Sequence, residues 1–356
     1  MDTTPEVREL LVVLTHRYAF REVAYLLGVG ATGLALRQRD VARLQQLCAY
    51  GQRLMDLDGE DLARRDAAPG AGTDHTIATM VGDELVPAHL VERGRLSSIR
   101  RRPREHPTDA LVSLRPAYRL LLEVIAARWQ RRETAALVAL AHIASEYAPM
   151  LAWERVLGHA GDPVRIAADP AFTGPDSRWG HLEDRRCPQT KRDKAAGARA
   201  LRVSREPPEG FQSYLDRQHS AVAHGLGVCA TDCPHPCPVL TSRPAADRAA
   251  LHDACRLAVA YSQSGLVRLR HAAPVGHGFG VPSRHEVAQA WQRTRDAMAK
   301  RGVALPDDGY PLPGLPTLFS AIAGVELRPD TLLADTAAEI NAQLDPAGTV
   351  RWPVAA

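Results

Sequence analysis

The stretch from Glu133 to His159 constrains the fold of this chain more than any other part of its sequence. Apolar residues recur through it at helical spacing, and one stripe contains Leu137, Leu140, Ala141, Ala144 and Tyr147. We expect Pro149 to kink this helix, because proline removes a hydrogen bond from a helix interior. A second long helix is predicted directly before it, from Ala117 to Arg132. Two adjacent packing helices predict a mainly α, multi-helix protein with few or no strands.

Length and composition fit a globular protein. The chain has 356 residues, enough for one large or two medium domains. Hydrophobic residues make up 45% and charged residues 24%, and no window approaches the roughly 18 apolar residues of a membrane span. The N-terminal sequence MDTTPEVREL carries acids and no apolar core, unlike a signal peptide. We therefore predict a cytoplasmic protein with no membrane partner.

The charge of the chain is nearly balanced. Its formal net charge of +3 does not by itself indicate nucleic-acid binding, which needs basic residues concentrated on one face. Of the 44 basic residues, only Lys191, Lys194 and Lys300 are lysine, and Ala, Gly, Pro and Arg are abundant. Because this composition is typical of a GC-rich genome, the arginine excess alone is weak evidence for phosphate binding.

The chain divides into four expected regions. They are a helical part at 1–65, a linker and basic segment at 66–109, a helical core domain at 110–300 with a cysteine-rich loop at 181–240, and a C-terminal extension at 301–356. The basic segment contains Arg100, Arg101 and Arg102, which are either phosphate contacts or part of a solvated loop. Residues 266–275 could form a short strand, and after them Ser283 and Glu286 have the spacing of a helix capping box.

Three of the six cysteines lie within nine residues. Cys229, Cys233 and Cys237 have three-residue spacers, and the prolines at 234, 236 and 238 disfavour helix there. Because cytoplasmic thiols are kept reduced, such a cluster indicates a metal site or a redox group. We expect an irregular loop that directs these thiols to one metal, with Cys187 as the fourth ligand and His235, His224 and His181 as its alternatives.

The spacing of the cysteines does not decide which metal they bind. Zinc sites favour cysteine pairs two to four residues apart. Iron–sulfur sites use four cysteines, often three close together and one distant, and a proline commonly follows a ligand. Proline follows Cys187, Cys233 and Cys237, which favours a [4Fe–4S] cluster over Zn²⁺. Alternatively, these thiols lie in a loop without metal, while Cys48 and Cys255 fall on apolar helices and are expected in the core.

The sequence REVAYLLGVGATGLALRQRD, residues 21–40, resembles the helix-turn-helix family of DNA-binding modules. Val23, Ala24 and Leu27 match the first helix, Gly28 and Val29 the turn, and Leu34 the inward face of the second helix. The resemblance implies that Thr32, Arg37 and Arg39 face DNA. The match departs from the family at Arg37, usually apolar, and at Gly33, which weakens the second helix. A helical hairpin within a larger bundle is the alternative.

The sequence YLDRQHSAVAHG, residues 214–225, contains a second motif. Arg217 and His224 stand seven residues apart, so both project from one face if the segment is helical. The pair resembles the Arg-x4-6-His motif of HEPN ribonucleases, all-helical dimers that cleave RNA without metal. The resemblance implies that His224 assists proton transfer and Arg217 stabilises phosphate charge. A helix end without activity is the alternative.

Three functions remain open from the sequence. The first is a nucleic-acid-binding protein, DNA more than RNA, with a structural or redox metal site. The second is an HEPN-like, metal-independent ribonuclease of a defence or toxin system. The third is a non-enzymatic helical scaffold or assembly subunit, and a homodimer or larger assembly fits any of them. No nucleophile elbow, Walker loop or HExxH motif occurs, so common hydrolases and nucleotide-driven enzymes are disfavoured.

Overall fold

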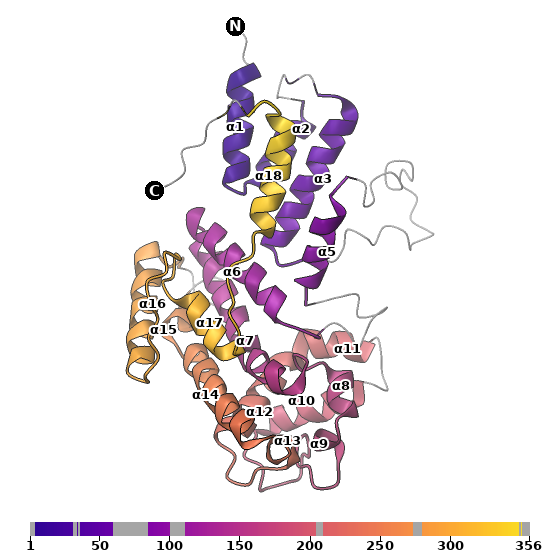
Figure 1. Cartoon of the computed structure of the whole chain (residues 1–356), viewed down its shortest axis with the longest axis vertical. Helices are drawn as coiled ribbons and strands as arrows, with labels where there is room; N and C mark the ends of the chain where they lie inside the picture. The colour runs from indigo at the N-terminus through magenta and orange to yellow at the C-terminus, as the bar shows by residue number, and fades with distance from the viewer. Residues whose placement is uncertain are drawn as a thin grey trace. The chain divides into compact units, whose positions relative to one another are not determined.

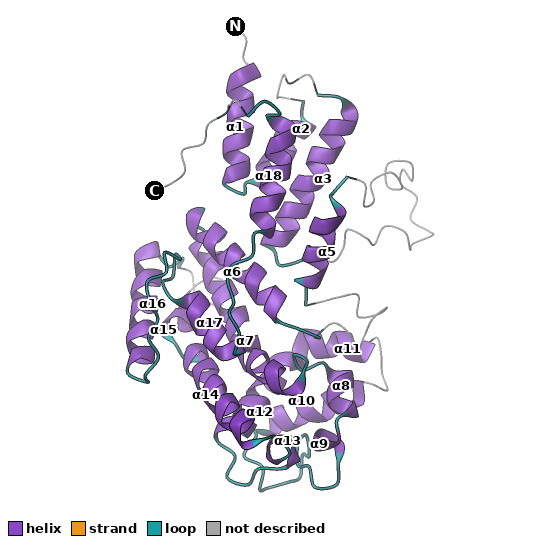
Figure 2. Cartoon of the chain, viewed as in Figure 1, coloured by secondary structure: helices purple, strands orange, loops and turns teal. Residues whose placement is uncertain are grey.

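The computed structural model describes residues 4–30, 34, 36–59, 85–99, 111–203, 209–272, 280–348 and 350. Every regular element within these residues is a helix, which confirms the mainly α prediction (Figure 2). The short strand suggested at 266–275 is not formed in its described part. That segment contains α15 (Gly265–Arg268) and the 3₁₀-helix η4 (Leu269–Ala272).

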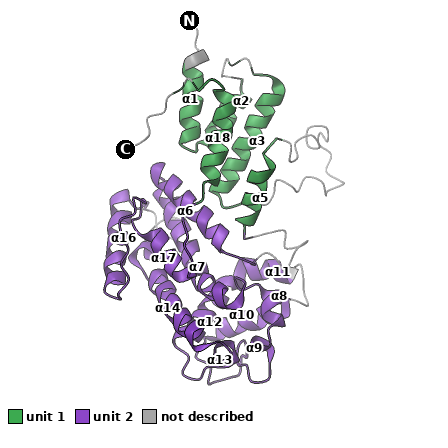
Figure 3. Cartoon of the chain, viewed as in Figure 1, with its two compact units in different colours: residues 1–98, 330–356 green, residues 99–329 purple. Residues whose placement is uncertain are grey.

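The chain forms two compact units (Figure 3). Unit 1 contains residues 1–98 and 330–356, and unit 2 contains residues 99–329. The region 301–356, which the sequence suggested as a single extension, is therefore divided between the units at residue 330. The reason is that apolar residues of the last helix pack with the N-terminal helices, a long-range contact that no local pattern indicates.

Unit 1 is a helical bundle built from both ends of the chain. Its helices are α1 (Thr4–His16), α2 (Phe20–Gly28), α3 (Gln38–Met55), α5 (Ala88–Leu96) and α18 (Leu332–Leu344). The C-terminal helix α18 lies against α1, α3 and α5 (Figure 1). The guanidinium of Arg93 on α5 pairs with Asp330 at 2.6 Å and Asp335 at 2.5 Å. These ion pairs and the buried apolar face of α18 close the bundle.

Unit 2 is organised around α7 (Thr134–Leu157), which packs against most of the other long helices of the unit. The long helices around it are α6 (Arg115–Gln130), α12 (His219–Thr231), α14 (Ala245–Ser262) and α17 (Leu315–Ala323). The remaining elements are α8 (Pro163–Ala168), α9 (Pro170–Thr173), α10 (Lys191–Arg202), α11 (Glu209–Ser213), the π-helix η3 (Tyr214–Gln218), α13 (Pro238–Thr241) and α16 (Arg284–Ala299).

Helix α7 continues through Pro149 and ends at Gly158, whose φ of 73° suits a glycine cap. By length and composition it is the one described helix that could cross a membrane, and 67% of its most apolar window is buried inside the structure. Two buried hydrogen bonds join it to its neighbours. The Trp153 indole donates to the Leu226 carbonyl at 3.0 Å, and the Tyr261 hydroxyl donates to the Ala141 carbonyl at 3.0 Å. These contacts make α7 a core helix of unit 2.

The capping box expected at Ser283 is confirmed. Ser283 Oγ accepts a hydrogen bond from the Glu286 backbone N–H at 3.2 Å, and Glu286 Oε2 accepts one from the Ser283 backbone N–H at 2.7 Å. Two otherwise unpaired backbone donors are thereby satisfied at the start of α16.

Candidate functional site

The cysteine-rich region is more helical than the sequence suggested. Cys229 lies in the last turn of α12, Cys233 in the connection that follows, and Cys237 is the N-cap of α13. Pro238 begins α13, because proline suits the first position of a helix. The region 181–240 is therefore not a single irregular loop, since it also contains α10 and η3.

Three hydrogen bonds, from Gln189 and Arg178, join the segment that carries Cys187 to the segment that carries the other three cysteines. Gln189 Nε2 donates to Cys229 Sγ at 2.9 Å and to the Gly225 carbonyl at 3.3 Å. The Arg178 guanidinium donates to the carbonyl of His235. Helices α9, α10, α12 and α13 adjoin one another in the same part of unit 2 (Figure 1). Two stretches about forty residues apart thus meet at both ends of the Cys229–Cys237 run.

Burial and neighbouring thiols change the pKa values of Cys229 and Cys233. Burial raises the pKa of Cys229 well above its ordinary value, and the thiols of Cys237, Cys187 and Cys233 add to the increase, while the hydrogen bond from Gln189 opposes it. Burial also raises the pKa of Cys233, and the thiols of Cys187 and Cys237 act in the same direction. The backbone N–H of His235 and the charge of Arg178 favour its thiolate. Cys187 and Cys237 thus contribute to the pKa shifts of both Cys229 and Cys233.

The thiols do not converge on one point. In the described part of the chain, no group of three or more histidine, cysteine, aspartate or glutamate side chains is arranged to hold a metal ion. Among the alternative ligands, His224 is bonded to Asp193, and the side chains of His181 and His235 lie on exposed residues. Cys48 and Cys255 are fully buried on α3 and α14, as expected for core residues.

His224 and a buried carboxylate form a second constellation beside this one. His224 Nδ1 lies 2.8 Å from Asp193 Oδ2, and the side chains are 59% and 5% exposed. Asp193 also closes a capping box with Thr190 at the start of α10. Because an ionised carboxylate only accepts hydrogen bonds, Nδ1 is the donor in this pair. Asp193 was not identified from the sequence, since thirty-one residues separate it from His224.

Arg217 is exposed and has no hydrogen bond to His224 in the described residues. It lies in the π-helix η3, directly before α12. The expectation that the two residues share one face assumed α-helical spacing throughout, and the wider turn of η3 interrupts that spacing.

The predicted helix-turn-helix requires a correction. Its first helix matches α2, but Leu34, Leu36 and Arg37 are not helical, and α3 begins only at Gln38. Nine residues separate the helices, whereas the motif joins them with a turn of three or four. Arg37 is the N-cap of α3 and its guanidinium pairs with Asp40 at 2.8 Å, and Arg39 lies in the first turn. The other predicted nucleic-acid contacts, at Thr32, Arg100, Arg101 and Arg102, lie outside the described residues.

A polar cluster between α7 and α12 was missed. Glu146 lies 3.2 Å from His142 Nε2 and 3.6 Å from His219 Nε2, and Arg270 of η4 also contacts His142. Burial alone would raise the pKa of Glu146, but His142 and His219 outweigh it and lower the pKa to about 2. His142 and Glu146 are four residues apart, and this helical spacing could have indicated their contact from the sequence. The contributions of His219 and Arg270 depend on tertiary packing.

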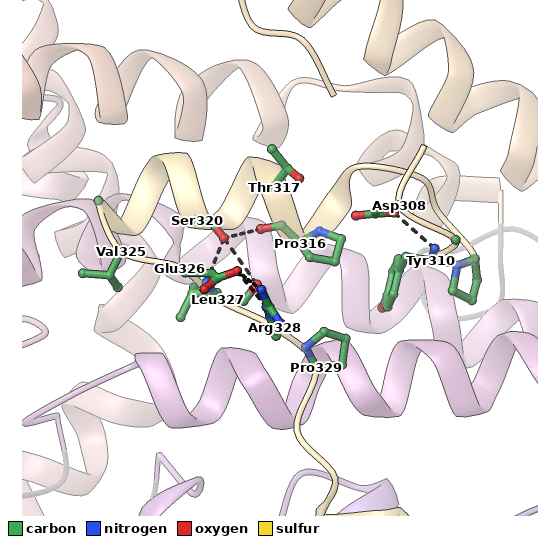
Figure 4. A pocket seen from close by; sticks show the side chains of 13 residues that line it. Asp308, Tyr310, Pro316, Thr317, Ser320, Val325, Glu326, Leu327, Arg328 and Pro329 are labelled. Carbon is green, nitrogen blue, oxygen red and sulfur yellow. Dashed lines mark hydrogen bonds and ion pairs between the residues drawn. The ribbon is translucent and has the colours of Figure 1, made fainter. Parts of the chain in front are cut away.

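A pocket of about 940 Å³ lies along α17, between the 308–311 turn and the 324–329 segment (Figure 4). Several of its polar groups are bonded to other residues of the pocket wall. Ser320 Oγ donates to the Pro316 carbonyl at 2.7 Å and accepts from the Leu327 N–H at 2.8 Å, and Arg328 pairs with Glu326 at 2.7 Å. The pocket contains none of the predicted site residues, and its shape alone specifies no chemistry.

Comparison with models of known protein families gives no match, and searches of curated proteins and of solved structures find none either. The four-cysteine site and the His224–Asp193 pair are therefore interpreted from their own geometry.

Proposed function

We propose that this protein binds nucleic acid and carries a [4Fe–4S] cluster on Cys187, Cys229, Cys233 and Cys237. The observation that carries the proposal is the pair of hydrogen bonds, Gln189 to Cys229 and Arg178 to His235, that join the two cysteine-bearing segments. Three cysteines close in sequence and one distant cysteine are a common ligand set for such a cluster.

The sequence pattern of the cysteines favours a cluster over zinc. A single zinc ion draws all its sulfur ligands to about 2.3 Å from one centre. Each iron of a cubane cluster instead takes its own cysteine, so the ligands surround a larger body. The prolines that follow Cys187, Cys233 and Cys237 also fit the second ligand set better, since a proline commonly follows a cluster ligand. The Gln189 amide and the Arg178 charge are then the groups that would adjust the reduction potential of the cluster.

Anaerobic purification tests the cluster. The protein should be brown and contain iron and sulfide, and Cys187→Ser or Cys233→Ser should lose most of both. Cys255→Ala is the matched control, because Cys255 is a buried cysteine of the same unit on α14 and should leave the iron content unchanged. If the protein is colourless and releases zinc to a chelator, the bound metal is Zn²⁺ and not an iron–sulfur cluster. Equal iron loss in all three variants would refute the assignment of the ligands.

Nucleic acid is the proposed partner because cations surround Cys187. Arg185 and Arg186 precede it, Lys191 and Arg192 follow it, and all four are exposed. Clustered cations of this kind attract phosphates by releasing counterions, and the affinity falls steeply with salt. Titration of the full chain with labelled duplex DNA and RNA at two salt concentrations should give salt-dependent binding, stronger for DNA. Cluster-loaded protein that binds neither duplex would refute this partner.

The His224–Asp193 pair supports a second candidate, a metal-independent ribonuclease. His224 Nε2 would take the proton of a ribose 2′-hydroxyl, whose oxygen attacks the adjacent phosphorus while the 5′-oxygen leaves with a proton from water. The products are a 2′,3′-cyclic phosphate and a 5′-hydroxyl, and Arg217 would offset the phosphate charge. The buried Asp193 carboxylate orients the ring for this step.

Assays with labelled RNA separate this candidate from the first. His224→Ala should abolish cleavage and Asp193→Asn should lower its rate about 10²-fold or more, as general base catalysis predicts. His252→Ala is the control, because His252 is another exposed histidine that contacts an aspartate in unit 2. Cleavage that survives His224→Ala would exclude this candidate.

A further inference from the structure

The outward face of α10 presents positive charge and no other polar group. The helix, KRDKAAGARALR, contains five cations and one acid. The acid, Asp193, is buried and bonded to Thr190 and His224, while Lys194 is buried and donates to the Asp184 carbonyl at 2.6 Å. The other four cations are exposed or half-exposed. We call them the α10 surface: Lys191, Arg192, Arg199 and Arg202.

The spacing of these cations suits an extended polyanion. Arg192, Arg199 and Arg202 are seven and three residues apart, so they follow one side of the helix together with the exposed Ala195. From Arg192 to Arg202 the helix rises about 15 Å. Alanine is the smallest side chain with a Cβ, so the surface between the arginines leaves room for the backbone of a polyanion to approach the helix. A rigid row of cations over that length can contact several successive phosphates.

The neighbouring elements add little negative charge. On η3, Asp216 is bonded to Gln212 and Arg217 is exposed. On α8 the only charged side chain is Arg165, and α12 contributes the exposed His224. In the preceding segment, Glu183 and Asp184 equal Arg185 and Arg186 in number, and Asp184 pairs with Arg186 at 3.3 Å. Positively charged side chains therefore outnumber negatively charged ones among the described residues of α10 and of the helices packed against it.

We propose that the α10 surface binds the phosphate backbone of double-stranded DNA. This inference rests on the proposed nucleic-acid partner, and it adds where that partner binds and in which form. Single-strand binding uses exposed aromatic side chains as stacking platforms. Among the described Phe, Tyr and Trp residues only Tyr25 is exposed, and it belongs to unit 1. The surface therefore fits a duplex contacted through its backbone.

The same surface favours DNA over RNA and non-specific over specific binding. Duplex RNA is recognised largely through its 2′-hydroxyl groups. Helix α10 contains no serine, threonine, asparagine or glutamine that would make such contacts. Phosphate contacts position a protein on a duplex and carry no sequence information directly. Affinity should therefore vary little with DNA sequence and strongly with salt.

The test compares two variants of the full-length, cluster-loaded protein. One has the α10 surface neutralised by K191Q, R192Q, R199Q and R202Q. The control has R248Q, R293Q, K300Q and R301Q, which remove the same number of exposed lysines and arginines elsewhere in unit 2. Binding of a short fluorescently labelled DNA duplex is measured by anisotropy over a range of salt concentrations, with circular dichroism and iron content as checks of the fold.

We expect the α10 variant to bind at least about tenfold more weakly at low salt. The slope of log K against log salt should become shallower by up to about 3.6, which is about 0.9 for each of four lost phosphate contacts. The control should change affinity and slope much less. If both variants bind equally, or if R37Q with R39Q weakens binding more than the α10 variant, this inference is overturned while the proposed partner stands. Tighter binding of duplex RNA would overturn the choice of DNA. Wild-type protein that retains iron but binds no duplex would instead refute the proposed partner itself.

Discussion

Asp162 and His159 are a buried acid and a buried base that lie within one turn of unit 2. Asp162 is fully buried at the start of α8, where Oδ1 accepts hydrogen bonds from the N–H groups of Val164 at 3.0 Å and Arg165 at 3.2 Å. His159 Nδ1 accepts the Asp162 N–H at 3.1 Å, so that nitrogen carries no proton. Burial raises the pKa of Asp162 to about 7 and lowers the pKa of His159 to about 4. Each side chain is therefore held in its neutral form over part of the acidic range.

Their effects on stability have opposite signs. Between pH 4 and pH 7, folded Asp162 keeps a proton that the unfolded chain has lost, so its contribution to stability falls as pH rises. From pH 4 to the unfolded histidine pKa of 6.5, the unfolded chain binds a proton that folded His159 does not, so the contribution of His159 rises. From pH 4 to about 6.5, the loss of stability from Asp162 and the gain from His159 therefore offset each other.

In Asp162→Asn, only His159 of this pair should make the free energy of unfolding depend on pH. Asparagine still caps the helix but has no charge to bury. Relative to wild type, the free energy of unfolding of the variant should increase from pH 4 to pH 7, by at most about 4 kcal/mol, and then level off. Urea unfolding at a series of pH values measures the difference. A difference that stays constant from pH 4 to pH 8 would show that Asp162 is ionised in the folded protein.

At the scale of elements, the start of α16 is a helix boundary that the local sequence determined. Ser283 and Glu286 form their predicted capping box on an exposed part of α16. Arg37 shows the limit of local patterns, because α3 begins one residue after it rather than before Leu34. Periodicity identifies that a helix exists, and caps and long-range packing decide where it begins.

Ser283→Ala should destabilise the protein by about 1 kcal/mol, since the Glu286 N–H loses its acceptor. Ser283→Asp is the matched variant and should remain within a few tenths of a kcal/mol of wild type, because aspartate also caps helices well. Thermal and urea unfolding measure both. Equal destabilisation by the two substitutions would mean that the serine stabilises α16 by another route.

At the scale of the whole molecule, unit 1 depends on a helix from the far end of the chain. Leu332, Leu333, Ile340 and Leu344 of α18 are buried, and α18 contacts α1, α3 and α5. Without α18, the apolar faces of the N-terminal helices would be left in water.

Ile340→Ala should therefore destabilise unit 1 by about 2–5 kcal/mol, the usual cost of a cavity at a fully buried isoleucine. Hydrogen exchange measures the stability of each unit separately. The amides of α1 and α3 in unit 1 should exchange faster, and the exchange rates of α7 and α14 in unit 2 should not change. Ala338→Ser, on the exposed side of α18, should have little effect. Faster exchange throughout the chain would mean that the units unfold together.

The sequence alone determined the helical class, the capping box at Ser283 and the buried cysteines Cys48 and Cys255. These features follow from periodicity and from hydrogen bonds between residues a few positions apart, which are local. Tertiary structure decided that Gln189 meets Cys229, that Asp193 orients His224 and that α18 completes unit 1. Such contacts join residues tens to hundreds of positions apart, and they form only where apolar helix faces find their partners, which no short segment of sequence specifies.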